Sequence, residues 1–219
     1  MKLYFHYCPS NFSNTYLLGT DFSSTDFLSA KSPQEKDTFP REAIIVDPGI
    51  MDASLLNMIE ENNYSLKGIL ITHDHPHHIQ GLRAILRIYE TEVFAINPVV
   101  GEYHTTLVKD GQLFNISTFK VEVFSIPGHS ADSAVFRVDR FLFTGDAISA
   151  CRLGSTASSY SAATQTSAII RKILSLPGDY TILPGHGPPS SLEAERRFNL
   201  ELNSFEQHKN RRPAFRFES

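Results

Sequence analysis

His73-Asp74-His75-Pro76-His77-His78 places four of the nine histidines of the chain within six residues. The cluster follows a short apolar run, Gly68–Ile71, and precedes an amphipathic stretch, so it predicts a loop between a buried strand and a helix. Binding and catalytic residues concentrate in such loops. Neutral imidazole is a common ligand of zinc and iron at physiological pH. The cluster therefore indicates a metal site, and the competing interpretation is a solvated histidine-rich loop.

The spacing of the histidines within the cluster indicates that they serve two different metal ions. His73 and His75 are two residues apart, so on an extended turn both imidazoles can point into one coordination sphere. His77 and His78 come later and are better placed for a second metal ion. Asp74 is out of phase with His73 and His75, and we expect it to face away from both, outside the metal site or in solvent.

Outward from the cluster, the hydrophobic pattern predicts alternating strands and helices. In the first half, strands are expected at Leu3–Phe5, Thr15–Leu18, Ala43–Val46, Gly68–Ile71 and Val93–Ile96, with helices that begin at Asp52 and at Ile79. In the second half, antiparallel hairpins are expected from Leu113–Ile116, Phe119–Ile126, Ala134–Val138 and Phe141–Phe143. A helix at Thr164–Leu176, a strand at Tyr180–Leu183 and an amphipathic stretch at Ser191–Glu206 follow. This order is typical of an α/β layered domain.

Length and composition narrow the class of protein. The 219 residues suit one sizeable domain, which we expect over 1–208, with an exposed polar excursion at 21–41 and a flexible tail at 209–219. A net charge of −4 gives no reason to expect nucleic acid or an anionic membrane as a partner. Cys8 and Cys151 are too few for a disulfide framework. Without an apparent signal peptide or a long apolar run, we expect a cytoplasmic protein with a small-molecule substrate.

Three later positions repeat the arrangement of a polar residue after a predicted strand. His129 lies in Ile126–Ser130 (IPGHS), Asp146 in Phe143–Asp146 (FTGD), and His186 in Leu183–Gly187 (LPGHG). Each is flanked by glycine, which permits sharp turns and close backbone approach. Any one of them alone would be read as an ordinary loop residue.

Together with the 73–78 cluster, these motifs resemble the metallo-β-lactamase superfamily. The wording TH-x-H-x-x-H, PGHS, TGDA and PGHGP is most similar to the type II glyoxalase (hydroxyacylglutathione hydrolase-like) branch. The resemblance runs from about residue 14 to residue 186. It implies a four-layer αββα sandwich, with the metals in a cleft at one edge of two sheets.

The resemblance also implies a ligand set. It assigns His73, His75 and His129 to a first metal ion and His78 and His186 to a second, with Asp146 bridging both. Asp47 matches a family position near the site, where a hydrogen bond to a ligand or a bound water is expected. The implied cofactors are two divalent metal ions, with zinc as the first expectation and iron or manganese as alternatives.

The implied activity is hydrolysis. Two such ions would share a hydroxide that attacks the carbonyl carbon of a thioester or related ester, while one ion stabilises the developing oxyanion. No serine or cysteine nucleophile is needed. Asp146, His77 and Asp47 are the residues that we expect to take part in catalysis beside the metals.

The chain departs from the family motif H-x-H-x-D-H at His77, where the family has aspartate. A metal-bound imidazole cannot accept the proton or hydrogen bond that a free carboxylate oxygen would. Three outcomes follow: His77 binds the second metal through nitrogen, the site is mononuclear at His73, His75 and His129, or His77 turns away. We favour the first, because the other ligands of the second metal are retained.

Substrate recognition is also altered. From the length of 219 residues we expect no counterpart of the C-terminal helical domain of full-length glyoxalase II enzymes, and Gly154–Ala157 lacks a G-R-x-D-like segment, so glutathione specificity stays open. Two alternatives to a hydrolase are kept. One is an iron-dependent persulfide dioxygenase that uses His73, His129 and Asp146, and the other is a catalytically impaired metal-binding scaffold. The oligomeric state is open as well.

Overall fold

The computed structural model describes residues 1–20 and 41–203. Most of the predicted excursion and the whole predicted tail therefore lie outside the described residues. Arg41, the last residue assigned to the excursion, is instead the first residue of a strand, and its backbone N–H donates to the Asn63 carbonyl oxygen.

The first half of the chain forms a six-stranded sheet in the order β1-β2-β3-β4-β5-β8. These strands are β1 Lys2–Cys8, β2 Ser13–Gly19, β3 Arg41–Val46, β4 Tyr64–Leu70, β5 Glu92–Ala95 and β8 Thr106–Leu107. The pairs β1–β2 and β2–β3 are antiparallel, and β3–β4, β4–β5 and β5–β8 are parallel. A short antiparallel pair that the sequence pattern did not predict, β6 Val99–Val100 with β7 Tyr103–His104, lies between β5 and β8 in the chain.

The second half forms another six-stranded sheet in the order β16-β15-β12-β11-β10-β9. Its strands are β9 Leu113–Ile116, β10 Phe119–Ser125, β11 Ala134–Val138, β12 Phe141–Gly145, β15 Thr181–Pro184 and β16 Ser190–Ser191. The predicted hairpins from β9 to β12 are confirmed, whereas β12 pairs with β15 in parallel. A two-residue hairpin turn joins β13 Ile148–Ser149 to β14 Arg152–Leu153, outside this sheet.

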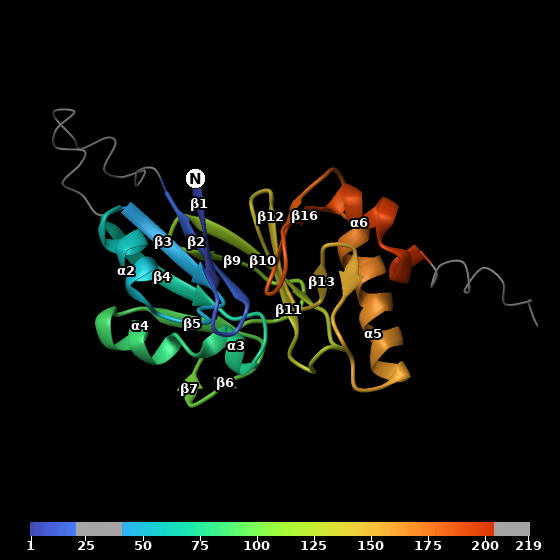
Figure 1. Ribbon diagram of the computed structural model, residues 1–219, viewed down its shortest axis with the longest axis horizontal. Helices are drawn as coiled ribbons and strands as arrows, with labels where there is room; N and C mark the ends of the chain where they lie inside the picture. The colour runs from blue at the N-terminus through green and yellow to red at the C-terminus, as the bar shows by residue number, and fades with distance from the viewer. Residues whose placement is uncertain (21–40, 204–219) are drawn as a thin grey trace, which may run out of the picture.

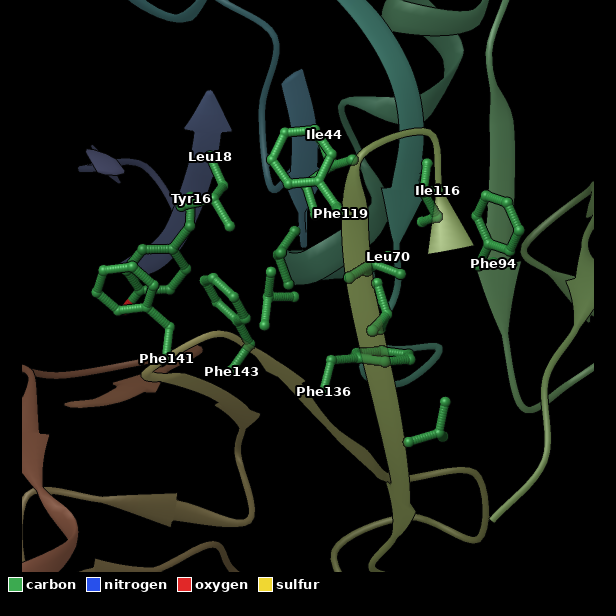
Figure 2. Packing of buried hydrophobic residues seen from close by; sticks show 14 of the residues in the cluster. Tyr16, Leu18, Ile44, Leu70, Phe94, Ile116, Phe119, Phe136, Phe141 and Phe143 are labelled. Carbon is green, nitrogen blue, oxygen red and sulfur yellow. The ribbon is translucent and has the colours of Figure 1, made fainter. Parts of the chain in front are cut away.

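Three separate hydrophobic clusters establish the four layers. The cluster between the sheets combines Tyr16, Leu18, Ile44 and Leu70 of the first sheet with Phe119, Phe136 and Phe143 of the second (Figure 2). The outer face of each sheet has its own cluster, shared with the covering helices. Alternate residues of a strand face opposite layers, as β geometry requires: Tyr16 and Leu18 face the other sheet and Leu17 faces the helices. The predicted αββα sandwich is confirmed.

The helices lie on the two outer faces (Figure 1). The first sheet is covered by α2 Ala53–Glu60, α3 Pro76–Ile79 and α4 Leu82–Ile88, and the second by α5 Ser159–Ile169, the π-helical η2 Ile170–Leu174 and α6 Leu192–Phe198. No helix in the described part of the chain is both long enough and apolar enough to cross a bilayer.

Helix boundaries are where the sequence predictions were least accurate. The helix expected from Ile79 is two helices, broken where the Gly81 N–H donates to the Pro48 carbonyl oxygen at 2.8 Å. The helix expected from Thr164 begins earlier, because the Ser158 hydroxyl caps it by accepting from the Ser161 N–H. Helix α6 ends at Phe198, and a further helical turn at 200–203 follows Asn199. The first of these boundaries depends on a tertiary contact, which leaves no periodic signal in the sequence.

Candidate metal centre

Four predicted ligands converge at the edge where the two sheets meet. His73 and His75 lie in the loop after β4, His129 lies between β10 and β11, and Asp146 follows β12. The His75 Nδ1 atom is 3.0 Å from His73 Nε2 and 3.1 Å from His129 Nε2. Asp146 Oδ2 lies 3.9 Å from His73 Nε2 and 3.5 Å from His129 Nε2. Three nitrogens and a carboxylate oxygen thus surround one point.

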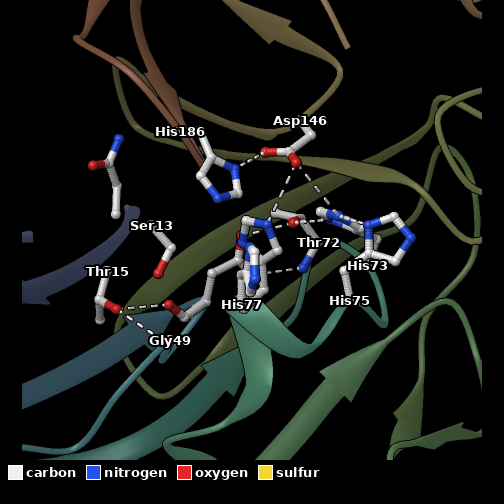
Figure 3. Close-up of polar contacts among 12 residues, drawn as sticks. Ser13, Thr15, Gly49, Thr72, His73, His75, His77, Asp146 and His186 are labelled. Atoms are coloured by element: carbon white, nitrogen blue, oxygen red, sulfur yellow. Dashed lines mark hydrogen bonds and ion pairs between the residues drawn. The ribbon is translucent and has the colours of Figure 1, made fainter. Parts of the chain in front are cut away.

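A second group shares the same aspartate. His78 Nε2 lies 3.6 Å from Asp146 Oδ2. His186 Nδ1 lies 2.8 Å from Asp146 Oδ1 (Figure 3). Within each group, the candidate ligand atoms all lie within 4.8 Å of one another. The carboxylate of Asp146 therefore stands between two imidazole sets, in the position expected of a bridging ligand.

The two groups fit divalent metal ions on observations internal to this structure. His78 is fully buried, yet both of its ring nitrogens lack a hydrogen-bond partner, an arrangement that costs free energy unless something coordinates them. Gly185 packs directly on this corner, since a Cβ there would come within 2.4 Å of His78 Cε1 and 2.7 Å of Asp146 Oδ1. Sets of imidazole nitrogens with one carboxylate suit zinc or iron.

The tautomer of His73 is fixed by a chain of hydrogen bonds that starts at Asp47. The Thr72 hydroxyl lies 2.6 Å from Asp47 Oδ2 and must donate there, because the carboxylate can only accept. The same hydroxyl oxygen lies 3.0 Å from His73 Nδ1, so it accepts from that N–H. His73 Nε2 is then left with a lone pair directed at the metal point, as a ligand requires.

His129 is oriented in the same way by a main-chain oxygen. Its Nδ1 donates to the Ser155 carbonyl at 2.8 Å, which leaves Nε2 unprotonated and facing the group. Partners of this kind fix the ring and the tautomer of metal-binding histidines.

Asp47 supports both groups at once. Besides Thr72, its Oδ2 lies 3.3 Å from His78 Nδ1, and its side chain is 3% exposed. Its backbone has φ +50°, a left-handed conformation that is uncommon for a residue with a side chain. The structure thus places Asp47 next to the predicted ligands, without direct access to the point where they meet.

The pKa values of the group follow from burial and charge. Burial and the neighbouring His78 lower the pKa of His73 to about 3, so this ring is neutral at pH 7. Burial also lowers the pKa of His78, but the nearby carboxylates of Asp146 and Asp47 outweigh it and raise that pKa to about 9. Burial raises the pKa of Asp146, yet His186 and His78 hold it well below its usual range. In the metal-free chain His78 thus carries a proton that a metal ion must displace.

His77 and Asp74 are not drawn into the two groups. The exposed His77 ring has its centroid 5.7 Å from that of His186, and the residue belongs to neither of the sets within 4.8 Å. Its role as a ligand stays a prediction. Asp74 faces away, as expected, since its carboxylate accepts from the Gly101 N–H at 2.9 Å.

Sequence reasoning missed the residues that hold the ligands in place. Thr72 immediately precedes the histidine cluster, and its hydroxyl was open to notice, but nothing in the sequence pairs it with Asp47. The support from the Ser155 carbonyl is a main-chain contact and left no signal in the side-chain pattern. A cavity of about 630 Å³ next to this support, lined by Arg152, Gly154 and Gln165 among others, was also not foreseen.

The fold and this double imidazole–carboxylate group define a class, the α/β sandwich proteins with a metal centre between two sheets. Comparison with known families identifies the particular family within this class: the family model described as "Metallo-beta-lactamase superfamily" matches residues 39–186. The chain belongs to the metallo-beta-lactamase superfamily.

Individual relatives and solved structures agree with this placement. The chain is similar to proteins named hydroxyacylglutathione hydrolase from Edwardsiella ictaluri (27% identity, 76% of this chain, 67% of that protein) and Francisella tularensis (33% identity, 66% of this chain). The match spans 58% of the Francisella protein. The fold of this chain is similar to that of ETHE1 from Myxococcus xanthus (21% identity, TM-score 0.76, 97% of this chain, 93% of that chain). It is also similar to TTHA1623, solved in a di-iron-bound form (21% identity, TM-score 0.68, 90% and 98%).

Proposed function

We propose that this protein is a metal-dependent hydrolase that cleaves a thioester, or a related ester, of a small substrate. The observation that carries the proposal is the position of the Asp146 carboxylate between two sets of histidines. His73, His75 and His129 would hold one divalent ion, and His78 and His186 would hold the other. A carboxylate shared by two ions is the arrangement of binuclear hydrolytic sites.

The chemistry divides between the metals and the chain. Divalent ions bound there would lower the pKa of a water molecule towards neutrality and polarise the substrate carbonyl. Asp146 would bind both ions and so join the two sets of ligands. Asp47 and Thr72 would hold His73 in the tautomer that presents Nε2. His77, the exposed neighbour of His186, is the side chain that we propose as an additional nitrogen ligand of the second ion.

The thioester is favoured over other esters by the relatives. The two described above are named for a reaction on hydroxyacylglutathione. The cavity of about 630 Å³ is lined by Arg152 and by Ser155, whose carbonyl oxygen accepts the His129 Nδ1–H, and it would offer space for the part of the substrate that does not react. We propose this cavity as the place where specificity is set.

A second candidate is an iron-dependent persulfide dioxygenase. It is favoured by the exclusion of His77 from the second group, which would weaken that group and leave one metal at His73, His129 and Asp146. The two candidates differ in metal content and in whether oxygen is consumed.

The test combines metal analysis with two assays on protein purified without chelator and without added metal. We expect about two metal ions per chain, hydrolysis of a hydroxyacylglutathione thioester, and no oxygen uptake with glutathione persulfide. Asp146→Asn should abolish both activity and the second metal, whereas His104→Ala, at an exposed histidine of β7, should change neither. One iron per chain with oxygen uptake would establish the dioxygenase instead. A metal-loaded protein inactive in both assays would contradict the proposal and favour the impaired scaffold.

A further inference from the structure

The short hairpin formed by β13 and β14 contacts two predicted metal ligands from behind. On its first strand, the Ser149 hydroxyl donates to the His186 carbonyl oxygen at 2.5 Å. Just after its second strand, the Ser155 carbonyl accepts the His129 Nδ1–H at 2.8 Å. These ligands belong to different predicted metal ions, so one small element braces both halves of the centre.

The same hairpin also packs against the bridging ligand. A Cβ on Gly154 would come within 1.8 Å of the Asp146 carbonyl oxygen, so only glycine allows this approach. The buried Gln165 side chain holds the contact by donating to the Gly154 carbonyl at 3.3 Å and to the Ala147 carbonyl at 3.2 Å. A displacement of this hairpin would therefore be transmitted to Asp146 as well.

The tip of the hairpin has a backbone that its own sequence does not favour. Ala150 and Cys151 form the two-residue turn, with φ values of +45° and +66°. Two-residue turns with positive φ at both positions are usually made by asparagine or aspartate followed by glycine. Residues that carry a Cβ adopt this conformation at a cost and keep it only where their surroundings impose it.

The turn at Ala150 and Cys151 is held by the carboxylate of Glu195 on α6. The Cys151 N–H points at this carboxylate, 2.9 Å from Oε1 and 3.1 Å from Oε2. Ser190 and Asn199 each donate a further hydrogen bond to the same group. Glu195 is 0% exposed and, within residues 1–20 and 41–203, has no basic side chain in ion-pairing distance. Neutral donors alone hold this buried carboxylate at the turn.

We propose that Glu195 is a positioning residue of the metal centre, which acts by fixing the strained 150–151 turn and, through the hairpin, His129, Asp146 and His186. The inference rests on the proposed metal centre. Glu195 belongs to neither group of candidate ligands, and its hydrogen bonds go to Cys151, Ser190 and Asn199. Its influence would appear in metal affinity and in ligand geometry, which distinguishes positioning from a general contribution to folding.

The test uses Co²⁺ as a probe, because its visible absorption reports ligand geometry and chelator competition reports its affinity. Glu195→Gln replaces one acceptor oxygen by an N–H₂ donor that faces other donors. Cys151→Gly allows the turn to keep positive φ without external support. Glu193→Gln, at an exposed position on the same helix, is the matched control.

We expect Glu195→Gln to weaken Co²⁺ binding about tenfold or more, as loss of a support for metal ligands commonly does, and to alter the absorption spectrum. Glu193→Gln should behave like the parent chain. Adding Cys151→Gly to Glu195→Gln should restore both affinity and spectrum, including the case in which Glu195→Gln alone fails to fold.

The possible results distinguish a failure of the metal centre from a failure of the role of Glu195. Failure of the parent chain to bind Co²⁺ would refute the metal centre and the inference with it. Binding by the parent chain with unchanged affinity and spectrum in Glu195→Gln would refute the inference alone. A double variant that stays impaired, or does not fold, would show that Glu195 supports α6 rather than the turn, and would also overturn it.

Discussion

The hydroxyl of Thr72 shows how one residue sets the chemistry of another. It is the middle link between the buried carboxylate of Asp47 and the Nδ1 atom of His73, with contacts of 2.6 and 3.0 Å. Without this hydroxyl, either ring nitrogen of His73 could carry the proton, and one of the two neutral tautomers would present an N–H to the metal.

Replacing Thr72 by valine keeps the shape and removes the hydroxyl. We expect the affinity for the metal of the His73 group to fall about 10- to 100-fold, as found for partners that orient metal-binding histidines. Loss of a hydrogen bond to the buried Asp47 carboxylate should also lower the free energy of unfolding by about 1–3 kcal/mol. Chelator competition and chemical denaturation measure the two effects. Thr72→Ser is the control and should retain most of both.

His77 is the residue at which the chain differs from its family motif. His77→Asp would add a negative charge beside His186 and supply a carboxylate oxygen able to accept a proton. We expect tighter binding of the second metal and a kcat/KM for thioester hydrolysis about tenfold higher or more, in the range of general acid–base contributions. His77→Asn, which has similar size and no charge, should give no such gain. Equal activities in the two variants would contradict this account.

Among the elements, α2 is the clearest case in which the sequence alone predicts the start of a helix. Asp52 caps it, and its carboxylate accepts from the Leu55 N–H at 2.9 Å and contacts His6 Nε2 at 3.0 Å. Leu55 and Ile59, spaced for one helix face, are both fully buried. Local chemistry and tertiary packing agree here.

Asp52→Ala should therefore lower the free energy of unfolding by about 1 kcal/mol at pH 7, the usual contribution of an N-cap. Burial raises the pKa of Asp52, but the Leu55 N–H and His6 lower it more, so its net direction is downward. A lowered folded pKa stabilises the protein above the unfolded value of about 4, and this contribution is lost as the pH falls below it. Asp52→Asn keeps the cap and should lack that pH dependence in urea unfolding.

The sequence predicts most strands well because they depend on local patterns, whereas the metal ligands were assigned through the family resemblance. Short apolar runs bounded by turn residues predicted β1 to β5 and β9 to β12, and the motifs around His129, Asp146 and His186 pointed to ligands only when taken together with the 73–78 cluster. The β13–β14 turn was missed because Ala150 and Cys151 are poor turn formers that distant Glu195 holds in place. Relations between remote residues, such as Asp47 with Thr72, have no period or spacing from which to infer them.

For the whole molecule, the arrangement of the two sheets makes the centre a link between them. His73 and His75 come from the loop after β4 and His78 from α3, all on the side of the first sheet, whereas His129, Asp146 and His186 come from loops of the second. Direct hydrogen bonds also cross this boundary at the site, including Asn14 N–H to the Gly185 carbonyl oxygen at 2.7 Å. Metal binding should therefore stabilise the packing of one half on the other.

Removal of metal should lower the melting temperature markedly. With free metal at a thousand times its Kd, binding contributes about 4 kcal/mol, which corresponds to roughly 8–16 °C for a chain of this size. Calorimetry with and without a chelator measures the difference. Asp146→Asn, which should lose the second metal, should show a smaller difference in melting temperature between the two conditions. A parent chain whose melting ignores the chelator would show that metal does not hold the halves together.

The order of the ligands along the chain has a consequence for biosynthesis. His73 is made early and His186 more than a hundred residues later, so a growing polypeptide on the ribosome lacks the complete set until its final portion emerges. The histidines at positions 73–78 are therefore synthesised before their partner ligands from the second sheet. Metal uptake is then a late event in the maturation of this protein, and a truncated product that ends before residue 186 would be released without a finished centre.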